Sequence, residues 1–189
     1  MLKVIKADIW RYLEQGYSIV IPTNGHVNTD GRAVMGKGVA YQASKLFKNL
    51  DVSLGNQIKK QGNKLFYFPR QKLITFPTKE HWKYPSKIEL IVESAKALKV
   101  LLDNEKDLKV AMPKVGCGWG KLDWDKDVSH IISQILGDYS DKRLIIVDNE
   151  QGDAGQDFRG DNKENIKGST DKDTKPRIVN ANEFFAPGV

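Results

Sequence analysis

Glycine residues gather in two short loops of this sequence, and each loop comes after an apolar run that predicts a buried strand. The first loop holds Gly36 and Gly38, and the second holds Gly116, Gly118 and Gly120. Because glycine has no Cβ, such loops bring backbone N–H groups close to a bound anion. A single glycine-rich loop is also a plain tight connection, but two of them at one sheet edge indicate a phosphate or diphosphate site more strongly.

Lys79 is predicted to lie at the same sheet edge as those loops. It follows a predicted strand at 72–76, on the sheet edge where both glycine loops lie. A surface lysine is ordinarily solvated, but one that is partly desolvated and near other cations has a lowered pKa. Its free amine can then attack an aldehyde to form a Schiff base, whereas a protonated lysine acts as an electrostatic clamp. The sequence leaves both roles open.

The elements that position these residues alternate between strands and helices. Strands are predicted at 2–6, 19–21, 65–68, 72–76, 109–112 and 144–147, and Pro22 ends the second of them. Helices are predicted at 9–13 with Asp8 as N-cap, at 39–50, at 52–61, at 88–102 with a capping box from Ser86 to Glu89, and at 128–136. This order predicts an α/β fold with a mostly parallel sheet, in which ligands bind beyond the carboxyl ends of the strands.

Composition divides the chain of 189 residues into two parts. Residues 1–150 have the apolar content of one folded domain. Residues 151–177 hold few apolar side chains among many charged ones, which predicts a disordered linker, and apolar residues return at 178–189. We therefore expect a folded domain at 1–150 and a charged, disordered tail at 151–189.

Several classes of protein do not fit this composition. The longest apolar runs are too short to span a bilayer, and no signal segment opens the chain. Its single cysteine, Cys117, excludes an internal disulfide and favours the reducing cytoplasm. The histidines and Cys117 lack zinc-ligand spacing, so we predict no metal site. We also expect no cofactor, no membrane partner and a monomer.

Basic and aromatic residues are interleaved between positions 59 and 87, with eight lysines or arginines against one acid, Glu80. Basic side chains attract phosphates, and exposed aromatic faces stack on unpaired bases. The segment is therefore compatible with a site for single-stranded nucleic acid. The plainer interpretation is a pair of strands whose aromatics face the core and whose lysines are solvated.

Four segments resemble the macro domain family, whose members bind ADP-ribose. They are KADI at 6–9, the loop at 24–40 with VMGKGVA at its end, FPTKEHW at 76–82, and PKVGCG at 113–118. The resemblance covers roughly residues 1–148. It implies a three-layer α/β/α domain with a mixed, mostly parallel central sheet.

The resemblance also implies which residues contact the ligand. The aspartate matching Asp8 accepts the adenine amino group, and the loop at 24–40 holds the distal ribose and a phosphate. The implied ligand-binding residues are Asp8, Ile9, Asn24, Gly36, Lys37, Gly38, Val39, Gly116, Cys117, Gly118, Trp119 and Gly120. Plainer roles stay open, since Asp8 can be a helix cap and Asn24 a turn former. We interpret Cys117 as a packing residue, because no base accompanies it.

Within the family, these motifs look like the subgroup that contains antitoxin enzymes removing ADP-ribose from DNA bases, together with terminal ADP-ribose protein glycohydrolases. There the lysine matching Lys79 carries the chemistry, and we assign Asn28 a catalytic role beside it. The protein glycohydrolases have an aspartate where this chain has Gly120, which argues against that two-residue mechanism. We predict an ADP-ribosyl glycohydrolase acting on DNA. The alternatives are an ADP-ribose-1″-phosphate phosphatase and a non-catalytic reader.

Overall fold

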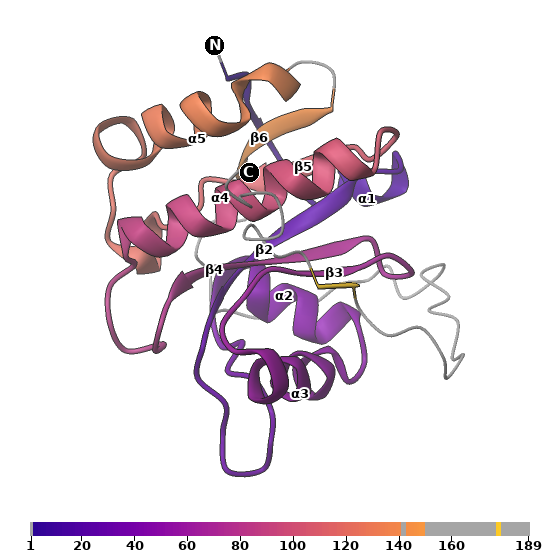
Figure 1. Cartoon of the computed structure of the whole chain (residues 1–189), viewed down its shortest axis with the longest axis vertical. Coiled ribbons are helices and arrows are strands. Elements are labelled where there is room, and N and C mark those ends of the chain that lie inside the picture. Colours follow the sequence, from indigo (N-terminus) through magenta and orange to yellow (C-terminus); the bar gives the residue numbers. More distant parts are fainter. Residues whose placement is uncertain (1, 141–142, 150–176, 179–189) are drawn as a thin grey trace, which may run out of the picture.

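A seven-stranded mixed sheet runs through the computed structural model, which describes residues 2–140, 143–149 and 177–178 (Figure 1). The strands lie in the order β1-β6-β5-β2-β4-β3-β7. Those from β1 to β4 in this order are parallel, and β3 and β7 are antiparallel to their neighbours. The predicted mixed, mostly parallel sheet is confirmed. The strands are β1 Val4–Ala7, β2 Ser18–Asn24, β3 Phe66–Phe68, β4 Leu73–Lys79, β5 Val110–Pro113, β6 Leu144–Asn149 and β7 Arg177–Ile178.

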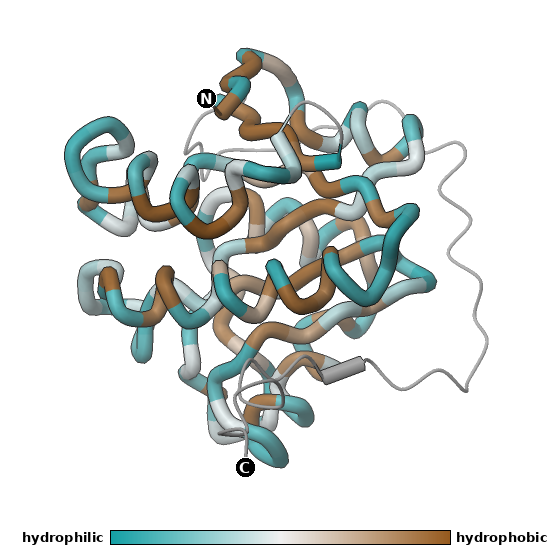
Figure 2. Tube along the Cα trace, turned by 45° about the horizontal axis from the view of Figure 1, so that its top comes forward, coloured by the Kyte–Doolittle hydropathy of each residue, from teal (hydrophilic) through white to brown (hydrophobic). Residues whose placement is uncertain are grey.

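Helices cover both faces of the sheet, which gives the predicted three layers (Figures 1 and 2). Side chains alternate along β2, so Ile19 and Ile21 pack with one set of helices and Val20 packs with the other. On the first face lie α1 Arg11–Glu14, α2 Gly38–Leu46 and α3 Leu50–Gln61. On the second lie α4 Ile88–Asn104 and α5 Ser129–Leu136. Among the described residues, no helix combines the length and apolarity needed to cross a bilayer.

Two strands run further than the sequence predicts. Pro22 does not end β2, which continues to Asn24. The backbone N–H groups of β2 alternate in direction, since that of Ser18 points to the β5 side and that of Ile19 to the β4 side. Position 22 therefore faces the β5 side, but β2 pairs with β5 only at Ser18 and Ile19. A proline there removes no ladder hydrogen bond. Similarly, β4 continues past Phe76, so Lys79 is the last residue of a strand and not part of a loop.

Two predicted helix caps are wrong, and one additional helical turn was not predicted. Ser86 and Glu89 form no capping box, because α4 begins at Ile88 with Lys87 as an N-cap that makes no side-chain cap bond. Asp8 is not an N-cap either, since α1 has Trp10 in that position, although the Asp8 carboxylate does accept the Trp10 N–H at 3.0 Å. The predicted helix at 128–136 is preceded by a π-helical turn, η2 Trp124–Val128.

The helix predicted at 39–50 ends at Leu46, and Leu50 belongs to the next helix. Asn49 adopts a φ of 62° between the two helices, which breaks the continuous pattern. The predicted disordered tail lies outside the described residues, apart from Arg177–Ile178, which pairs with β3. The division of the chain at residue 150 stays a prediction.

Candidate ADP-ribose site

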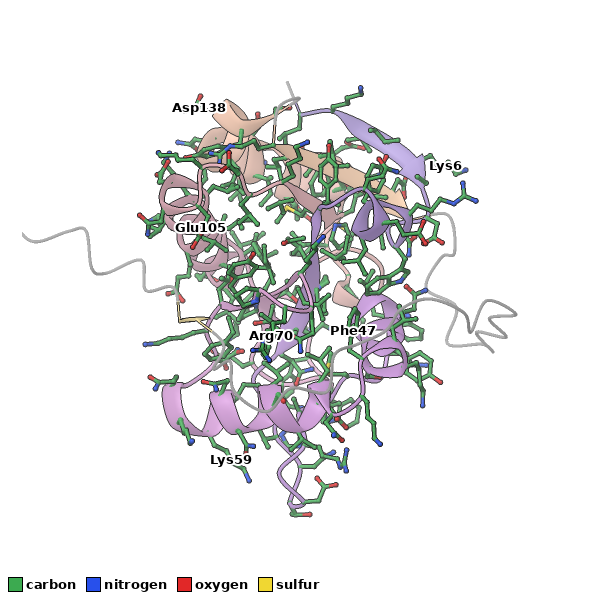
Figure 3. The ribbon with its side chains drawn as sticks, turned by 90° about the vertical axis from the view of Figure 1, so that its right-hand side faces the viewer. Lys6, Phe47, Lys59, Arg70, Glu105 and Asp138 are labelled. Carbon is green, nitrogen blue, oxygen red and sulfur yellow. The ribbon has the colours of Figure 1, made fainter. Side chains whose placement is uncertain are left out.

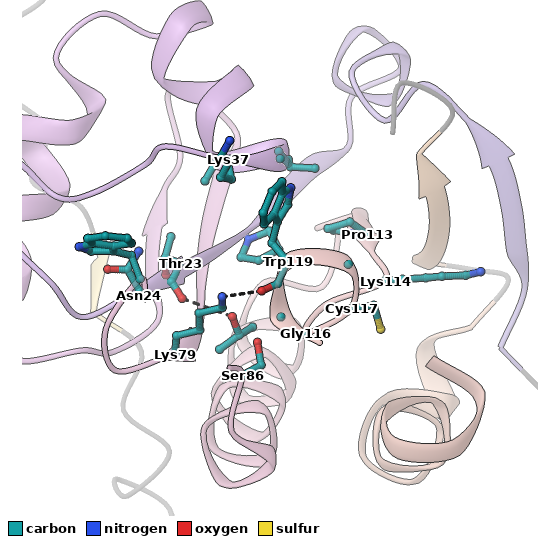
Figure 4. A pocket seen from close by; sticks show the side chains of 18 of the residues that line it. Thr23, Asn24, Lys37, Lys79, Ser86, Pro113, Lys114, Gly116, Cys117 and Trp119 are labelled. Atoms are coloured by element: carbon teal, nitrogen blue, oxygen red, sulfur yellow. Dashed lines mark hydrogen bonds between the residues drawn. The ribbon is translucent and has the colours of Figure 1, made fainter. Parts of the chain in front are cut away.

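A cavity of about 760 Å³ opens where four parallel strands end (Figure 4). Its lining includes the last residues of β2, β4, β5 and β6, namely Asn24, Lys79, Pro113 and Asn149. Parallel strands direct their carboxyl ends to one edge of a sheet, which is where open α/β sheets bind ligands. The volume falls within the roughly 300–1,000 Å³ of small-molecule sites. The two glycine loops and Lys79, which the sequence analysis singled out, therefore meet at one cavity.

The first glycine loop delivers the N-terminus of α2 to this cavity. Gly38, Val39 and Ala40 form the first turn and line the cavity, and the first helical hydrogen bond, from Tyr41 N–H, reaches back to Lys37. Lys37 makes no side-chain cap, and no acidic residue lies in the first turn. The N–H groups of the first turn have no acceptor within the helix, so they and the positive end of the helix dipole suit an anion.

Asn24 shapes this loop from the end of β2. Its Nδ2 donates to Val34 O at 2.9 Å, and its Oδ1 accepts the His26 N–H at 3.0 Å. The side-chain amide thus holds the chain on both sides of the loop. This geometry fixes the path of the backbone toward Gly36 and leaves Asn24 itself in the lining.

The second glycine loop packs down onto the start of α4. Gly116 has a φ of 78°, and a Cβ at that position would lie 2.7 Å from Ile91 Cδ1. A Cβ at Gly120 would lie 2.4 Å from Ser86 Oγ, and the Ser86 N–H donates to Gly120 O. Trp119 stands out between these close contacts, and Lys37 Nζ lies 4.6 Å from its ring centroid (Figure 4). The two loops therefore meet across the cavity.

Lys79 is held in this cavity by both its backbone and its side chain. Its carbonyl accepts hydrogen bonds from Asn63 Nδ2 at 2.9 Å and from Gly25 N–H at 3.2 Å. Its Nζ donates to the Trp119 carbonyl at 2.7 Å (Figure 4). Burial, and secondarily the charge of Lys121, lower the pKa of the Lys79 ammonium. A larger fraction of this lysine is therefore unprotonated than of a solvated one.

Positive charge dominates the lining. It contains five lysines, Lys37, Lys79, Lys83, Lys114 and Lys121. Among the described residues, Asp148 is the one carboxylate in the lining, and Lys114 Nζ lies 2.8 Å from its Oδ2. The remaining excess of positive charge suits a ligand that carries more than one phosphate.

Comparisons with known proteins point to one family, although no family model matches the chain. The macro domain of Thermus aquaticus DarG superposes with a TM-score of 0.61 at 27% identity, covering 78% of this chain and 97% of that one. The macro domain of Mycobacterium tuberculosis DarG gives 0.61 and 26%, with the same coverage. The chain has the macro domain fold.

Curated proteins agree with this assignment. A DNA ADP-ribosyl glycohydrolase of Thermus aquaticus is 32% identical over 133 residues, which are 66% of this chain and 35% of that protein. One of Mycobacterium tuberculosis is 30% identical over 109 residues, which are 53% and 31%. This macro domain chain thus spans about a third of the length of the curated relatives it matches.

The structure places most of the predicted ligand residues of this macro domain in the cavity lining. They are Asn24, Gly36, Lys37, Gly38, Val39, Gly116, Cys117, Gly118, Trp119 and Gly120. Asp8, Ile9 and Asn28 do not line it. Ile9 N–H donates to Asn149 Oδ1 at 3.2 Å, so the turn after β1 is joined to a lining residue. The Asn28 N–H donates to Arg32 O inside the loop, and the catalytic role of Asn28 stays a prediction.

The surroundings of Cys117 make its thiol a poor nucleophile. Burial raises the pKa of the Cys117 thiol to about 11, and its Sγ contacts Val115 O at 3.5 Å. A thiol that stays protonated is a poor nucleophile, which supports a packing role.

The ring centroid of His81 lies 4.2 Å from that of His26. Burial lowers the pKa of His81, and the charges of His26 and Lys83 lower it further.

Some lining residues of the macro domain were not predicted from the sequence. Asp148 and Asn149 end β6, and the rule that ligands bind beyond strand ends predicts them once the strand at 144–147 is included. Thr23, Thr78 and Ser86 also line the cavity, although the sequence did not single them out as ligand residues. Their place in the lining depends on how β2, β4 and α4 pack together.

Proposed function

We propose that this macro domain binds ADP-ribose and hydrolyses the bond between its distal ribose and a DNA base. The observation that carries the proposal is the Lys79 amine, which lies in the cavity between the two glycine loops and has a lowered pKa. The curated relatives named DNA ADP-ribosyl glycohydrolase support the same activity. A structure similar to this chain, of Thermosipho africanus DarTG, was solved in complex with ADP-ribose.

The N-terminus of α2 and the second glycine loop are the groups we assign to the diphosphate. Both present backbone to the cavity, and Lys37 and Lys121 add positive charge beside them. We assign the adenosine end to the side of the cavity formed by the end of β6, where Asn149 contacts the turn that carries Asp8 and Ile9. The distal ribose then extends toward Lys79.

Lys79 is the residue we propose for the chemical step. Its amine attacks C1″ of the ring-opened distal ribose and displaces the base nitrogen, which leaves with a proton, and a Schiff base forms between Nζ and C1″. Water then adds to the Schiff base, restoring the amine and releasing ADP-ribose. The Trp119 carbonyl orients the amine by accepting its hydrogen bond at 2.7 Å.

The surroundings of Gly120 support DNA rather than glutamate-linked protein as the substrate. The protein glycohydrolases have an aspartate at the matching position, and here Ser86 Oγ fills the space that its Cβ needs. Among the described lining residues the one carboxylate is Asp148, which Lys114 neutralises. A bond between ADP-ribose and protein whose hydrolysis requires a further carboxylate as base is therefore a poor substrate.

We further propose that the domain acts as a monomer in the cytoplasm.

A panel of three substrates tests this proposal. ADP-ribosylated single-stranded DNA, glutamate-linked ADP-ribosylated protein and ADP-ribose-1″-phosphate are incubated with the protein at equal concentrations, and initial rates of product release are compared. We expect the DNA to be hydrolysed fastest. Turnover of ADP-ribose-1″-phosphate alone would replace the proposal with a phosphatase. Tight binding of ADP-ribose without any turnover would indicate a reader.

A further inference from the structure

Three exposed aromatic side chains stand around the mouth of the cavity. Among the described residues four large hydrophobic side chains are exposed, and the three aromatic ones are Trp82 at 54%, Tyr84 at 54% and Trp119 at 52%. All three line the cavity, whereas the fourth, Val4, does not. Neither hydrophobic core includes these rings. Their exposure is therefore confined to the surroundings of the proposed active site.

The aromatic residues of the 59–87 segment fall into two groups. Phe66, Tyr67, Phe68 and Phe76 are buried in the sheet, as the plainer interpretation of this segment predicts. Lys59 lies in the last turn of α3, outside the cavity lining (Figure 3). Only the end of β4 and the residues that follow it reach the cavity, and the exposed aromatic ones among them are Trp82 and Tyr84, on either side of Lys83. A nucleic-acid interface is thus restricted to this rim.

The rim residues are arranged around His81. Its ring centroid lies 5.4 Å from that of Trp82 and 5.7 Å from that of Tyr84, and His26 packs on it from the loop after β2. Lys83 Nζ lies 5.1 Å from the Tyr84 ring centroid, which places a positive charge beside the aromatic surface. Glu80, the nearest acid in sequence, is engaged by Lys87 at 2.8 Å. The rim therefore combines exposed aromatic rings with net positive charge.

We propose that Trp82 and Tyr84 form a stacking platform for the bases next to the modified base on a single DNA strand, and that Lys83 contacts the intervening phosphate. Stacking requires bare base faces, which an unpaired strand offers and a duplex hides. Lysine beside an aromatic ring matches the alternation of phosphate and base along such a strand. The inference rests on the proposed function, because the modified base must sit at Lys79 for its neighbours to reach the rim.

Two substrates that differ only in flanking nucleotides test the platform. Wild type, Trp82→Ala and Tyr84→Ala are assayed for kcat/KM on an ADP-ribosylated mononucleotide and on an ADP-ribosylated single-stranded oligonucleotide. We expect each substitution to lower the ratio of oligonucleotide to mononucleotide kcat/KM by about 5- to 150-fold. Annealing a complementary strand to the oligonucleotide should lower the wild-type rate as well.

Tyr17→Ala is the matched control. Tyr17 also lies beside a lysine, with Lys109 Nζ 5.8 Å from its ring centroid, but it precedes β2 at the opposite end of the strand from the cavity. This substitution should leave the ratio unchanged, and thermal unfolding of all variants checks that they fold. An oligonucleotide and a mononucleotide hydrolysed equally well by wild type would overturn the platform alone. If wild type hydrolyses neither substrate, the proposed function is overturned instead. If the Trp82 and Tyr84 substitutions lower activity only on ADP-ribosylated protein, the rim is reassigned to a protein partner.

Discussion

The two glycine loops that line the cavity differ in what surrounds their glycines. A Cβ on Gly36 would meet no heavy atom within 4 Å. In the other loop, a Cβ on Gly116 would collide with Ile91, which is fully buried, and one on Gly120 would collide with Ser86. Gly116 and Gly120 are thus required by packing of the protein itself. The space at Gly36 is not used by the protein, and we assign it to the ligand.

The two loops also differ in what they present to the cavity. The second loop is fixed on α4 and offers the Trp119 carbonyl to the lysine amine at 2.7 Å. The first loop ends in the α2 N-terminus, whose N–H groups face the cavity without a side-chain cap. One loop therefore acts as a rigid support for the reacting group, and the other acts as the anion-binding surface. Substitutions that fill each space separate these two roles.

Gly116→Ala should have the largest effect, and the effect should be on stability. The added Cβ must fit 2.7 Å from Ile91 Cδ1 at a φ of 78°. Overpacking and the left-handed backbone together should lower the free energy of unfolding by about 2–4 kcal/mol. Urea denaturation followed by circular dichroism measures this difference. An unchanged midpoint would show that Ile91 moves aside and that the loop is not the rigid support described above.

Gly36→Ala should weaken ligand binding and leave the fold intact. The substitution meets no protein atom, and it should raise the free energy of unfolding by about 0.4–1 kcal/mol through the unfolded chain. If the diphosphate occupies this space, the affinity for ADP-ribose should fall by about tenfold, or about 1.4 kcal/mol. Calorimetric titration of wild type and variant with ADP-ribose measures this change in affinity. Equal affinities would mean that the ligand does not approach Gly36.

Lys121→Gln should have the smallest effect, a shift in the pH dependence of turnover. Lys121 follows the second loop, and its charge contributes to lowering the pKa of Lys79 below the 10.5 of a solvated lysine. An unprotonated amine gives a rate that rises with pH through this pKa. Removing the neighbouring charge raises the pKa of Lys79, so the rising limb of the profile should move to higher pH. Lys126→Gln, at an exposed lysine outside the cavity lining, is the control and should leave the profile in place.

Periodic patterns in the sequence predicted the parts of the fold whose cause is local. The β-branched run of β2 is buried on both faces of the sheet, and α4 packs its apolar face on the sheet; both elements formed where the pattern placed them. Element ends were less predictable, because they depend on neighbours. Pro22 stays inside β2 only because β5 no longer pairs at that point, and Ser86 fails as a cap because it packs under Gly120.

The candidate site was predictable to the extent that strand ends and glycines mark it. Both glycine loops and Lys79 were found in this way, and the cavity unites them. The lowered pKa of Lys79 and its bond to the Trp119 carbonyl were not predictable, because the partner residues lie 40 positions apart in the chain. The separate behaviour of Trp82 and Phe76, one exposed and one buried, likewise depends on where β4 ends.

The role of Lys79 in the chemical step is tested by single-turnover release of ADP-ribose from an ADP-ribosylated single-stranded oligonucleotide, compared between wild type, Lys79→Ala and Lys79→Arg. Lys79 lies apart from the groups we assign to the diphosphate and adenosine, so Lys79→Ala should abolish release while ADP-ribose affinity stays within about threefold. Lys79→Arg should be equally inactive, because a guanidinium stays protonated and cannot attack carbon. Partial activity of the arginine variant would make Lys79 an electrostatic clamp. Full activity of Lys79→Ala on this substrate would show that Lys79 does not carry out the hydrolysis.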